Sequence, residues 1–112
     1  MAFERLIYAT QPWQAGAHPL EGKKPAALGR ATLLRFLPGF ADPSWCENGH
    51  AGYVLEGSLR LELDDGAREV GAGEGFVVEP GTRHRAANPT EIPVVLFVAT
   101  YEASASAVSS SR

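Results

Sequence analysis

The stretch HAGYVLEGSLRLELDDGAREV, residues 50–70, decides the fold. Over Ser58–Leu63 three leucines alternate with polar residues, which is the period of a strand with one buried face. The Asp65–Gly66 pair that follows predicts a β-hairpin with a primed turn, because such turns need positive φ. Ala67–Val70 is then the returning strand. The centre of the chain is therefore predicted to be an antiparallel hairpin.

Further strands are predicted on both sides of this hairpin. Runs rich in apolar, β-branched or aromatic residues, bounded by Gly and Pro, predict strands at Arg5–Thr10, Arg30–Leu37, Gly52–Glu56, Phe76–Glu79, His84–Asn88 and Ile92–Tyr101. The Pro-containing segment Gln11–Ala27 is expected to be a long surface connection. Helical periodicity is not sustained anywhere, so we expect an all-β sandwich or barrel of many short strands.

Length and composition limit the function classes. The chain has 112 residues, 45% hydrophobic and 21% charged, which predicts one compact domain over residues 1–102. The Ser/Ala-rich residues 103–112 are expected to be a disordered tail. A net charge of −3 argues against a nucleic-acid partner, and no apolar run predicts a membrane span, so we expect a cytoplasmic protein. The single cysteine excludes an internal disulfide and an all-cysteine metal cluster.

Two segments resemble the two conserved motifs of the cupin family, the small jelly-roll β-barrels. They are HAGYVLEGSLRLEL and AGEGFVVEPGTRH. In the first, Gly57 fits the motif glycine, and His50 stands where the family has its glutamate. The second motif is matched in register by Gly73, Gly81, His84 and Asn88, while its proline is displaced by one position to Pro80 and Glu79 takes its place. The resemblance covers about residues 30–101 and implies a single cupin barrel.

The resemblance also implies a candidate metal site. In metal-binding cupins, two histidines and the glutamate of the first motif join the histidine of the second. Here the two histidine positions hold Ser44 and Cys46, or Pro43 and Trp45, depending on the spacing. The implied donors are therefore His50, His84 and Cys46, a nitrogen and sulfur set that suits Zn, Fe, Cu, Ni or Mn. The alternative is that both histidines are hydrogen-bonded polar groups in a mostly apolar pocket.

In the register that the cupin resemblance implies, strand parity predicts that the two histidines share one cavity. His50 lies on the same side as Val54, and Tyr53 lies on the other side, if no bulge intervenes. His84 is likewise grouped with Ala86, whereas Arg83 and Arg85 are expected on the outer face. Arg35, Arg83 and Arg85 could each bind a carboxylate or simply be solvated on a strand face.

Other residues near the motifs are candidates for ligand contact. Trp45 and Tyr53 are aromatic and could line a pocket or pack in a core or dimer contact. Glu47 is a candidate fourth donor or a solvated turn residue. Cys46 is a metal ligand, a thiolate activated by His50, or a small buried hydrophobe. His18 is expected at the surface.

Two functions remain open from the sequence. One is a protein that binds a small molecule in a cavity lined by Trp45, Cys46, Glu47, His50, Tyr53 and His84. The other is a metal-dependent cupin enzyme, of dioxygenase or isomerase type, that uses His50, His84 and Cys46 as ligands. A homodimer is also expected, because an edge strand needs cover and the Met1–Thr10 strand could be exchanged between copies.

Overall fold

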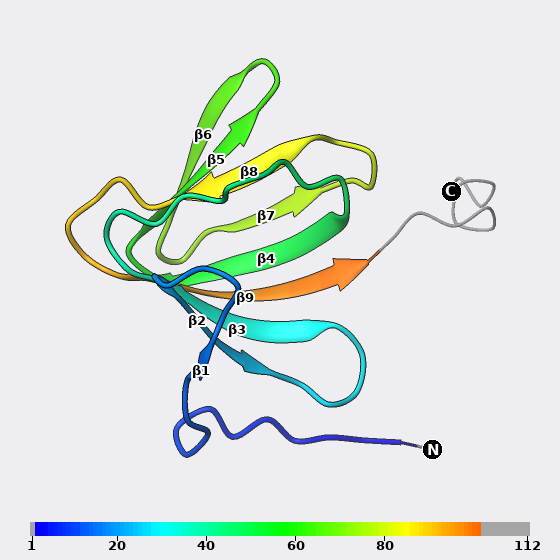
Figure 1. The fold of residues 1–112 in the computed structure, drawn as a ribbon. Helices are drawn as coiled ribbons and strands as arrows, with labels where there is room; N and C mark the ends of the chain where they lie inside the picture. The colour runs from blue at the N-terminus through cyan, green and yellow to red at the C-terminus, as the bar shows by residue number, and fades with distance from the viewer. Residues whose placement is uncertain (1, 102–112) are drawn as a thin grey trace, which may run out of the picture.

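The computed structural model describes residues 2–101, and within them it contains nine strands and no helix (Figure 1). The strands are β1 (Gln14–Ala15), β2 (Glu21–Pro25), β3 (Ala31–Phe36), β4 (Gly49–Glu56), β5 (Ser58–Leu63), β6 (Gly66–Gly71), β7 (Gly75–Val78), β8 (His84–Ala87) and β9 (Val94–Tyr101). None of the described residues forms a helix long and apolar enough to cross a membrane.

The strands form two antiparallel sheets. The six-stranded sheet has the order β1-β2-β3-β9-β4-β7, and the three-stranded sheet has the order β6-β5-β8. The predicted all-β jelly-roll fold is confirmed. Its hydrogen-bond ladder does not close into one continuous barrel, because the strand pairings join the described strands into two separate sheets.

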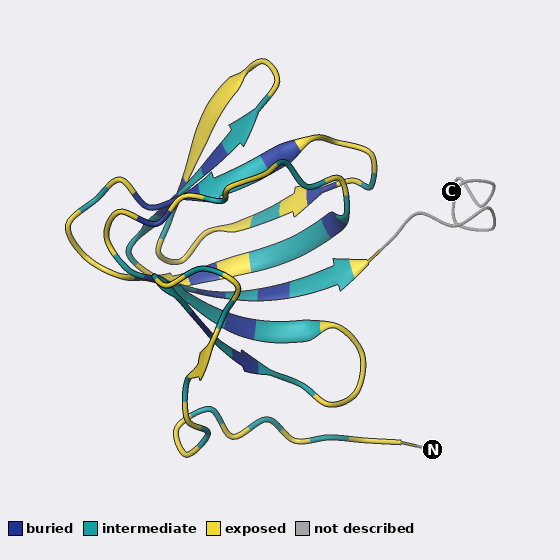
Figure 2. Cartoon of the chain, viewed as in Figure 1, coloured by how far each residue is buried: buried dark blue, intermediate teal, exposed yellow. Residues whose placement is uncertain are grey.

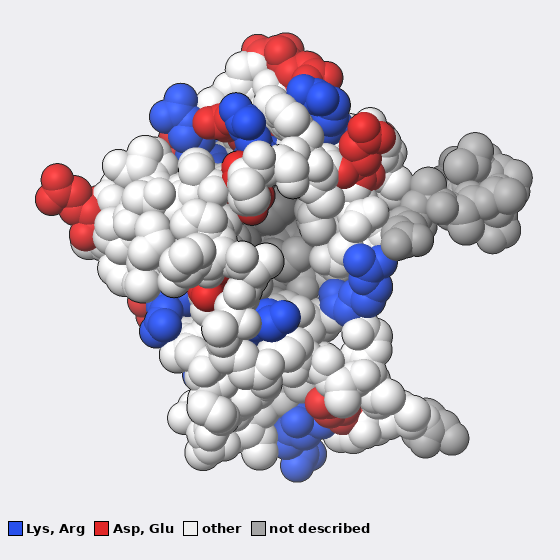
Figure 3. Space-filling view, viewed as in Figure 1, with Lys and Arg blue, Asp and Glu red and all other residues white. Residues whose placement is uncertain are grey.

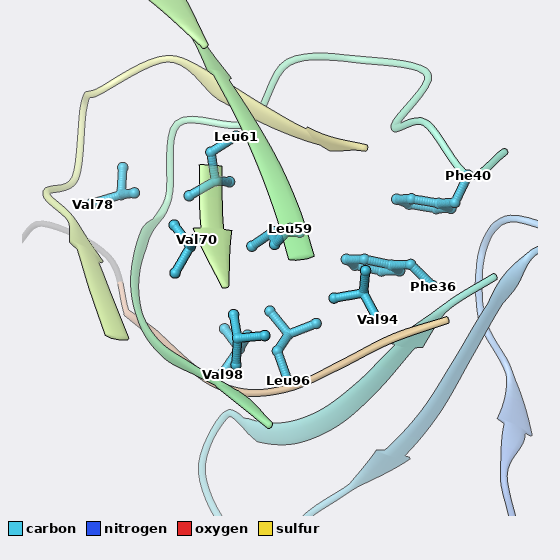
Figure 4. Close-up of a cluster of buried hydrophobic side chains, with 10 residues drawn as sticks. Phe36, Phe40, Leu59, Leu61, Val70, Val78, Val94, Leu96 and Val98 are labelled. Atoms are coloured by element: carbon cyan, nitrogen blue, oxygen red, sulfur yellow. The ribbon is translucent and has the colours of Figure 1, made fainter. Parts of the chain in front are cut away.

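The hydrophobic core lies between the two sheets (Figures 2 and 4). The buried members of this cluster are Phe36, Phe40, Val54, Leu59, Leu61, Val70, Val78, Val94, Leu96 and Val98. The predicted alternation in β5 is confirmed, since Leu59 and Leu61 are buried and the polar residues between them are only partly buried. Burial of these side chains stabilises the fold by about 2 kcal/mol each.

The central hairpin is confirmed, but the predicted turn chemistry is wrong. Leu63 pairs with Gly66, so Asp64 and Asp65 are the two connecting residues. Within the described chain no residue other than glycine has a positive φ, which excludes a type I′ turn at these aspartates. The positive φ of 128° falls on Gly66, at the first position of β6. In a primed Asp-Gly turn the glycine is the second connecting residue, whereas here Gly66 directly follows the two connecting residues.

The strand predicted at Arg5–Thr10 is not present. This segment contains a turn, in which Thr10 and Gln11 donate backbone hydrogen bonds to the carbonyl of Ile7. It is attached to the rest of the chain by side chains, because Glu4 accepts the N–H groups of Ala27 and Leu28 at 2.9–3.0 Å. In the same segment, the backbone carbonyl of Tyr8 accepts a hydrogen bond from Lys24 Nζ. A run of apolar residues is therefore not sufficient for this segment to pair with a neighbouring strand.

The segment Gln11–Ala27, predicted to be a connection, contains β1 and β2. Lysine and proline have low strand propensity, yet β2 pairs with β3 in register along its full length. Lys24 is 9% exposed, and its ammonium lies 4.6 Å from the centroid of the Trp13 ring. Packing against an aromatic ring accounts for a buried lysine here.

The remaining strand predictions are confirmed to within a few residues at each end. β3, β4, β7, β8 and β9 lie within or overlap the predicted ranges. The tail predicted at residues 103–112 lies outside the described part of the chain.

Candidate metal and ligand site

Three potential metal donors meet in the wall of one cavity. Cys46 lies in the connection between β3 and β4, His50 is the second residue of β4, and His84 is the first residue of β8. One donor atom from each of the three lies within 4.8 Å of the others. The imidazole centroids are 4.8 Å apart with an interplanar angle of 84°. The predicted meeting of two distant histidines is therefore observed.

The register of β4 against β9 orients His50. His50 stands opposite Thr100 in this antiparallel pair, and its Nδ1 lies 3.0 Å from Thr100 Oγ1. Its other nitrogen, Nε2, lies 3.8 Å from Cys46 Sγ. The Thr100 hydroxyl thus fixes the ring and leaves Nε2 directed at the thiol.

Burial keeps the His50 ring neutral. Desolvation, followed by the charges of His84 and Arg30, lowers the pKa of His50 to about 4. A neutral imidazole presents a lone pair, which is the form that binds a metal ion.

His84 has an unpartnered nitrogen. The residue is 3% exposed, and its Nδ1 donates a hydrogen bond of 2.8 Å to the carbonyl of Thr82. Because a carbonyl only accepts, Nδ1 carries a proton, and in the neutral ring Nε2 then carries a lone pair. Nε2 is buried and has no hydrogen-bond partner within the described residues. A buried acceptor left without a partner calls for a ligand, water or ion at that point.

The three side chains fit a transition-metal ion. Two neutral imidazoles and a thiolate are the donors that Zn, Fe, Cu or Ni accept, and the orphaned Nε2 of His84 marks where coordination would satisfy a buried group. The contacts of His50 with Thr100 and of His84 with the Thr82 carbonyl are the supporting interactions that histidine ligands usually make.

The cluster opens into a cavity of about 540 Å³. Apolar side chains from both sheets form most of its wall, among them Phe36, Leu59, Phe76 and Leu96. Figure 3 shows the hollow on the face toward the viewer, with carboxylate side chains near its rim. The volume lies within the range of small-molecule sites.

Five of the six predicted ligand-binding residues line this cavity. They are Trp45, Cys46, Glu47, His50 and His84. Tyr53 is not among the lining residues; its side chain is on the other side of β4 from Val54 and is 49% exposed. The parity of the strand, which groups Tyr53 apart from His50, explains its place on the outer face.

The arginines lie outside the cavity, as the parity of β8 predicted. Arg83 and Arg85 both lie over the Trp45 ring, with each guanidinium carbon 4.3 Å from the ring centroid. Arg85 also pairs with Glu62 at 2.7 Å, and Arg83 with Asp64 at 3.3 Å. Trp45 is therefore both a lining residue of the cavity and the partner of an outer arginine pair.

Sequence reasoning missed two acidic lining residues. Glu21 lies in the segment taken for a loop, and Asp42 lies in an irregular stretch before the first motif. Asp42 is placed by its carboxylate, which accepts the Ala86 N–H at 2.8 Å. The sequence carries no local signal for this contact, because it joins residues 44 positions apart.

These observations define a jelly-roll protein with an internal cavity and a candidate Cys/His/His metal centre in its wall. The family model described as "Cupin domain" matches residues 33–100, well over half of the chain. The protein therefore belongs to the cupin family. None of the curated protein sequences matches it.

Solved structures share the fold at low sequence identity. KdgF from Halomonas sp. aligns with a TM-score of 0.74 and 21% identity over 91% of this chain and 96% of that one. A sugar phosphate isomerase of the cupin superfamily from Silicibacter pomeroyi aligns at 0.73 and 18%, covering 89% and 76% of the two chains. The polyketide cyclase RemF from Streptomyces resistomycificus aligns at 0.75 and 23%, covering 90% and 81%. At these identities the likeness shows the fold alone.

Proposed function

We propose that the protein binds one transition-metal ion through Cys46, His50 and His84, and that a small organic molecule in the cavity completes the coordination. The observation that carries this proposal is the buried Nε2 of His84, which has a lone pair and no partner in the described chain. When bound, such an ion would polarise an oxygen or nitrogen of the ligand as a Lewis acid. The protein would then be a metal-dependent cupin enzyme. Proteins named as a sugar phosphate isomerase and a polyketide cyclase share its fold.

The chain's own residues have defined parts in this proposal. The Thr82 carbonyl holds the proton of His84 on Nδ1, so that Nε2 faces the ion as a lone pair. Thr100 holds the His50 ring, and the apolar wall would contact the body of the bound molecule.

A second candidate function is binding of a small molecule without metal. The same unpartnered Nε2 of His84 would then accept a hydrogen bond from the ligand. Binding of this kind does not need the Cys46 thiolate. Substitution of Cys46 therefore distinguishes the two candidate functions.

Metal analysis tests the proposal. Protein prepared without a polyhistidine tag is incubated with each of Zn, Fe, Cu, Ni and Mn ions, desalted and assayed for metal. We expect one ion per chain in the wild type and loss of that ion in His84→Ala and Cys46→Ser. His18→Ala is the matched control, because the His18 ring packs against Phe40 with 5.0 Å between the ring centroids and is not part of the three-residue group.

Two results would overturn the metal proposal. One is wild-type protein that stays metal-free under all five conditions while circular dichroism shows it folded. The other is a His84→Ala variant that retains the ion at wild-type stoichiometry. Loss of metal from Cys46→Ser with unchanged ligand binding would favour the second candidate function.

We also propose that the chain forms a homodimer. The outer face of the six-stranded sheet exposes Tyr53, Leu55 and Val77, at 49%, 48% and 70%. Burial of such a face against a second copy would remove an exposed apolar patch from water. Size-exclusion chromatography with light scattering is expected to give twice the chain mass, and a monomer at micromolar concentration would contradict it.

A further inference from the structure

The ionisable side chains that line the cavity outside the Cys/His/His group are all carboxylates. They are Glu21, Asp42 and Glu47, and within residues 2–101 no lysine or arginine belongs to the lining. Carboxylates near the rim of the hollow are visible in Figure 3, and the Lys and Arg side chains seen nearby belong to residues outside the lining. The charged groups of the lining outside the Cys/His/His group are therefore all negative.

Each of the three carboxylates keeps at least one oxygen lone pair that could accept a hydrogen bond from a ligand. Asp42 uses Oδ2 for the Ala86 N–H at 2.8 Å, and Oδ1 makes no hydrogen bond within the described chain. Glu21 accepts the Ala17 N–H at 3.1 Å through Oε1. Glu47 is held through its backbone carbonyl, which accepts the Gly81 N–H at 2.8 Å, and the residue is exposed.

A bound ion does not reverse this charge balance. Three carboxylates and the Cys46 thiolate carry four negative charges against two positive charges on a divalent ion. Arg30 acts on His50 and Arg85 acts on Asp42 through space, but neither arginine is a lining residue. The groups that a bound molecule would touch directly are therefore net negative with the ion present or absent.

The hydrogen-bonding capacity points the same way. The most buried polar group of the lining is His84, whose neutral ring offers Nε2 as an acceptor when Nδ1 donates to Thr82. Ser44, Asn48 and Trp45 of the lining can donate hydrogen bonds, whereas the ionised carboxylates only accept them. A ligand that donates hydrogen bonds satisfies the carboxylates, whereas an anion leaves like charges facing each other.

We infer that the cavity binds a molecule with an apolar, ring-sized body and a protonated amine, and that it discriminates against carboxylate- and phosphate-bearing molecules. The apolar body fits the wall formed by Phe36, Leu59 and Phe76, and the amine fits the acidic rim. This inference rests on the small-molecule cavity of the proposed function. It specifies the sign of the ligand's charge, which the metal site alone does not determine.

A charge-matched series of probes tests the inference. Phenethylamine, phenethyl alcohol and hydrocinnamate share one apolar body and end in a cation, a neutral group and an anion at pH 7. Binding of each to metal-free and metal-loaded protein is measured by isothermal titration calorimetry. We expect the amine to bind at least about tenfold more tightly than the carboxylate, with the alcohol between them.

Charge-removing variants locate the effect. Asp42→Asn and Glu47→Gln keep side-chain volume and are expected to reduce the preference for the amine by about threefold or more each. Glu91→Gln is the matched control, because Glu91 is exposed and lies outside the cavity. It is expected to leave the preference unchanged.

The outcomes separate this inference from the proposed function. If the carboxylate binds as tightly as the amine, if the amine fails to bind at millimolar concentration, or if neither lining variant alters the preference, the inference falls even where His84-dependent metal binding is intact. If the amine preference holds while no metal binds, the metal proposal falls and the charge class of the ligand stands.

Discussion

Cys46 and His84 are paired through both of their backbone hydrogen bonds. The Cys46 N–H donates to the His84 carbonyl at 2.8 Å, and the His84 N–H donates to the Cys46 carbonyl at 3.0 Å. This antiparallel bridge brings the β3–β4 connection alongside the edge of β8, although the connection is not a regular strand. Because neighbouring residues of an extended chain point to opposite sides, Cys46 faces His50 while Trp45 meets the arginines outside.

The contact of Trp45 with the two arginines predicts that Trp45 holds the segment carrying Cys46 in place. Its ring lies against Arg83 and Arg85, two cation–π contacts worth about 0.5–1 kcal/mol each at an exposed site. Trp45→Ala is expected to lower the free energy of unfolding by about 1–2 kcal/mol and to weaken metal binding, because the segment that carries Cys46 loses its outer attachment. Chemical denaturation and metal competition measure the two effects.

Trp45→Phe is the control, since it retains an aromatic face for the arginines. It is expected to keep metal affinity close to that of the wild type. Equal metal affinity in Trp45→Ala and the wild type would show that Cys46 is positioned without this contact.

The low pKa of His50 predicts a loss of stability in acid. In the unfolded chain the histidine titrates near 6.5, whereas burial and the charges of His84 and Arg30 set its pKa to about 4 in the folded protein. Between these values the unfolded state binds the extra proton, so the metal-free protein should lose stability as the pH falls from about 6.5 to 4 and no further on this account. Thermal denaturation in the presence of a chelator measures the trend.

His50→Gln isolates this titration. Desolvation raises the pKa of Asp42, which has the opposite sign and stabilises the fold as the pH falls, but Asp42 is present in both proteins. The difference in unfolding free energy between wild type and variant should therefore shrink or invert across this pH window. Parallel curves would mean that His50 does not titrate with a lowered pKa.

Asn88 predicts a large effect on stability from a small change. The side chain is fully buried, and its Nδ2 donates to the carbonyls of Phe36 and Ile92, both at 2.9 Å. Its Oδ1 accepts the Thr90 N–H and hydroxyl at 3.0 and 2.6 Å. Asn88→Asp keeps the shape but removes both donors, so a loss of about 2–4 kcal/mol is expected in chemical denaturation.

Thr90→Val provides the comparison, because it removes the hydroxyl and leaves the Asn88 donors in place. It is expected to cost about 1 kcal/mol. A loss in Asn88→Asp no larger than that in Thr90→Val would contradict the role assigned to the amide as a tie between the end of β3 and the approach to β9.

The sequence predicted the parts of this protein that depend on local periodicity. The alternation in β5 and the parity of His50 and His84 determine which side chains point inward, and both hold in the structure. The same parity places Tyr53 on the opposite face from His50, and Tyr53 does not line the cavity.

The remaining features depend on contacts between distant residues. β2 forms because β3 offers a partner along its length, which outweighs the poor strand propensity of its lysines. Asp42 enters the cavity through a bond to Ala86, and the outer arginines meet Trp45 only after the β3–β4 connection has paired with β8. None of these partners can be read from a short window of sequence.

Gly57 and Gly73 form a pair that separates backbone strain from steric conflict. Both have positive φ, 80° and 87°, so alanine at either position carries a conformational cost of about 1–2 kcal/mol. A Cβ on Gly73 would meet nothing within 4 Å, whereas one on Gly57 would collide with the Pro93 carbonyl oxygen and lie 3.1 Å from Val94 Cα. Gly57→Ala should therefore destabilise the protein clearly more than Gly73→Ala in the same denaturation assay, because backbone cannot move aside as a side chain can. Equal losses would show that the β4–β5 connection yields to the added methyl group, and that the first-motif glycine is needed for its φ alone.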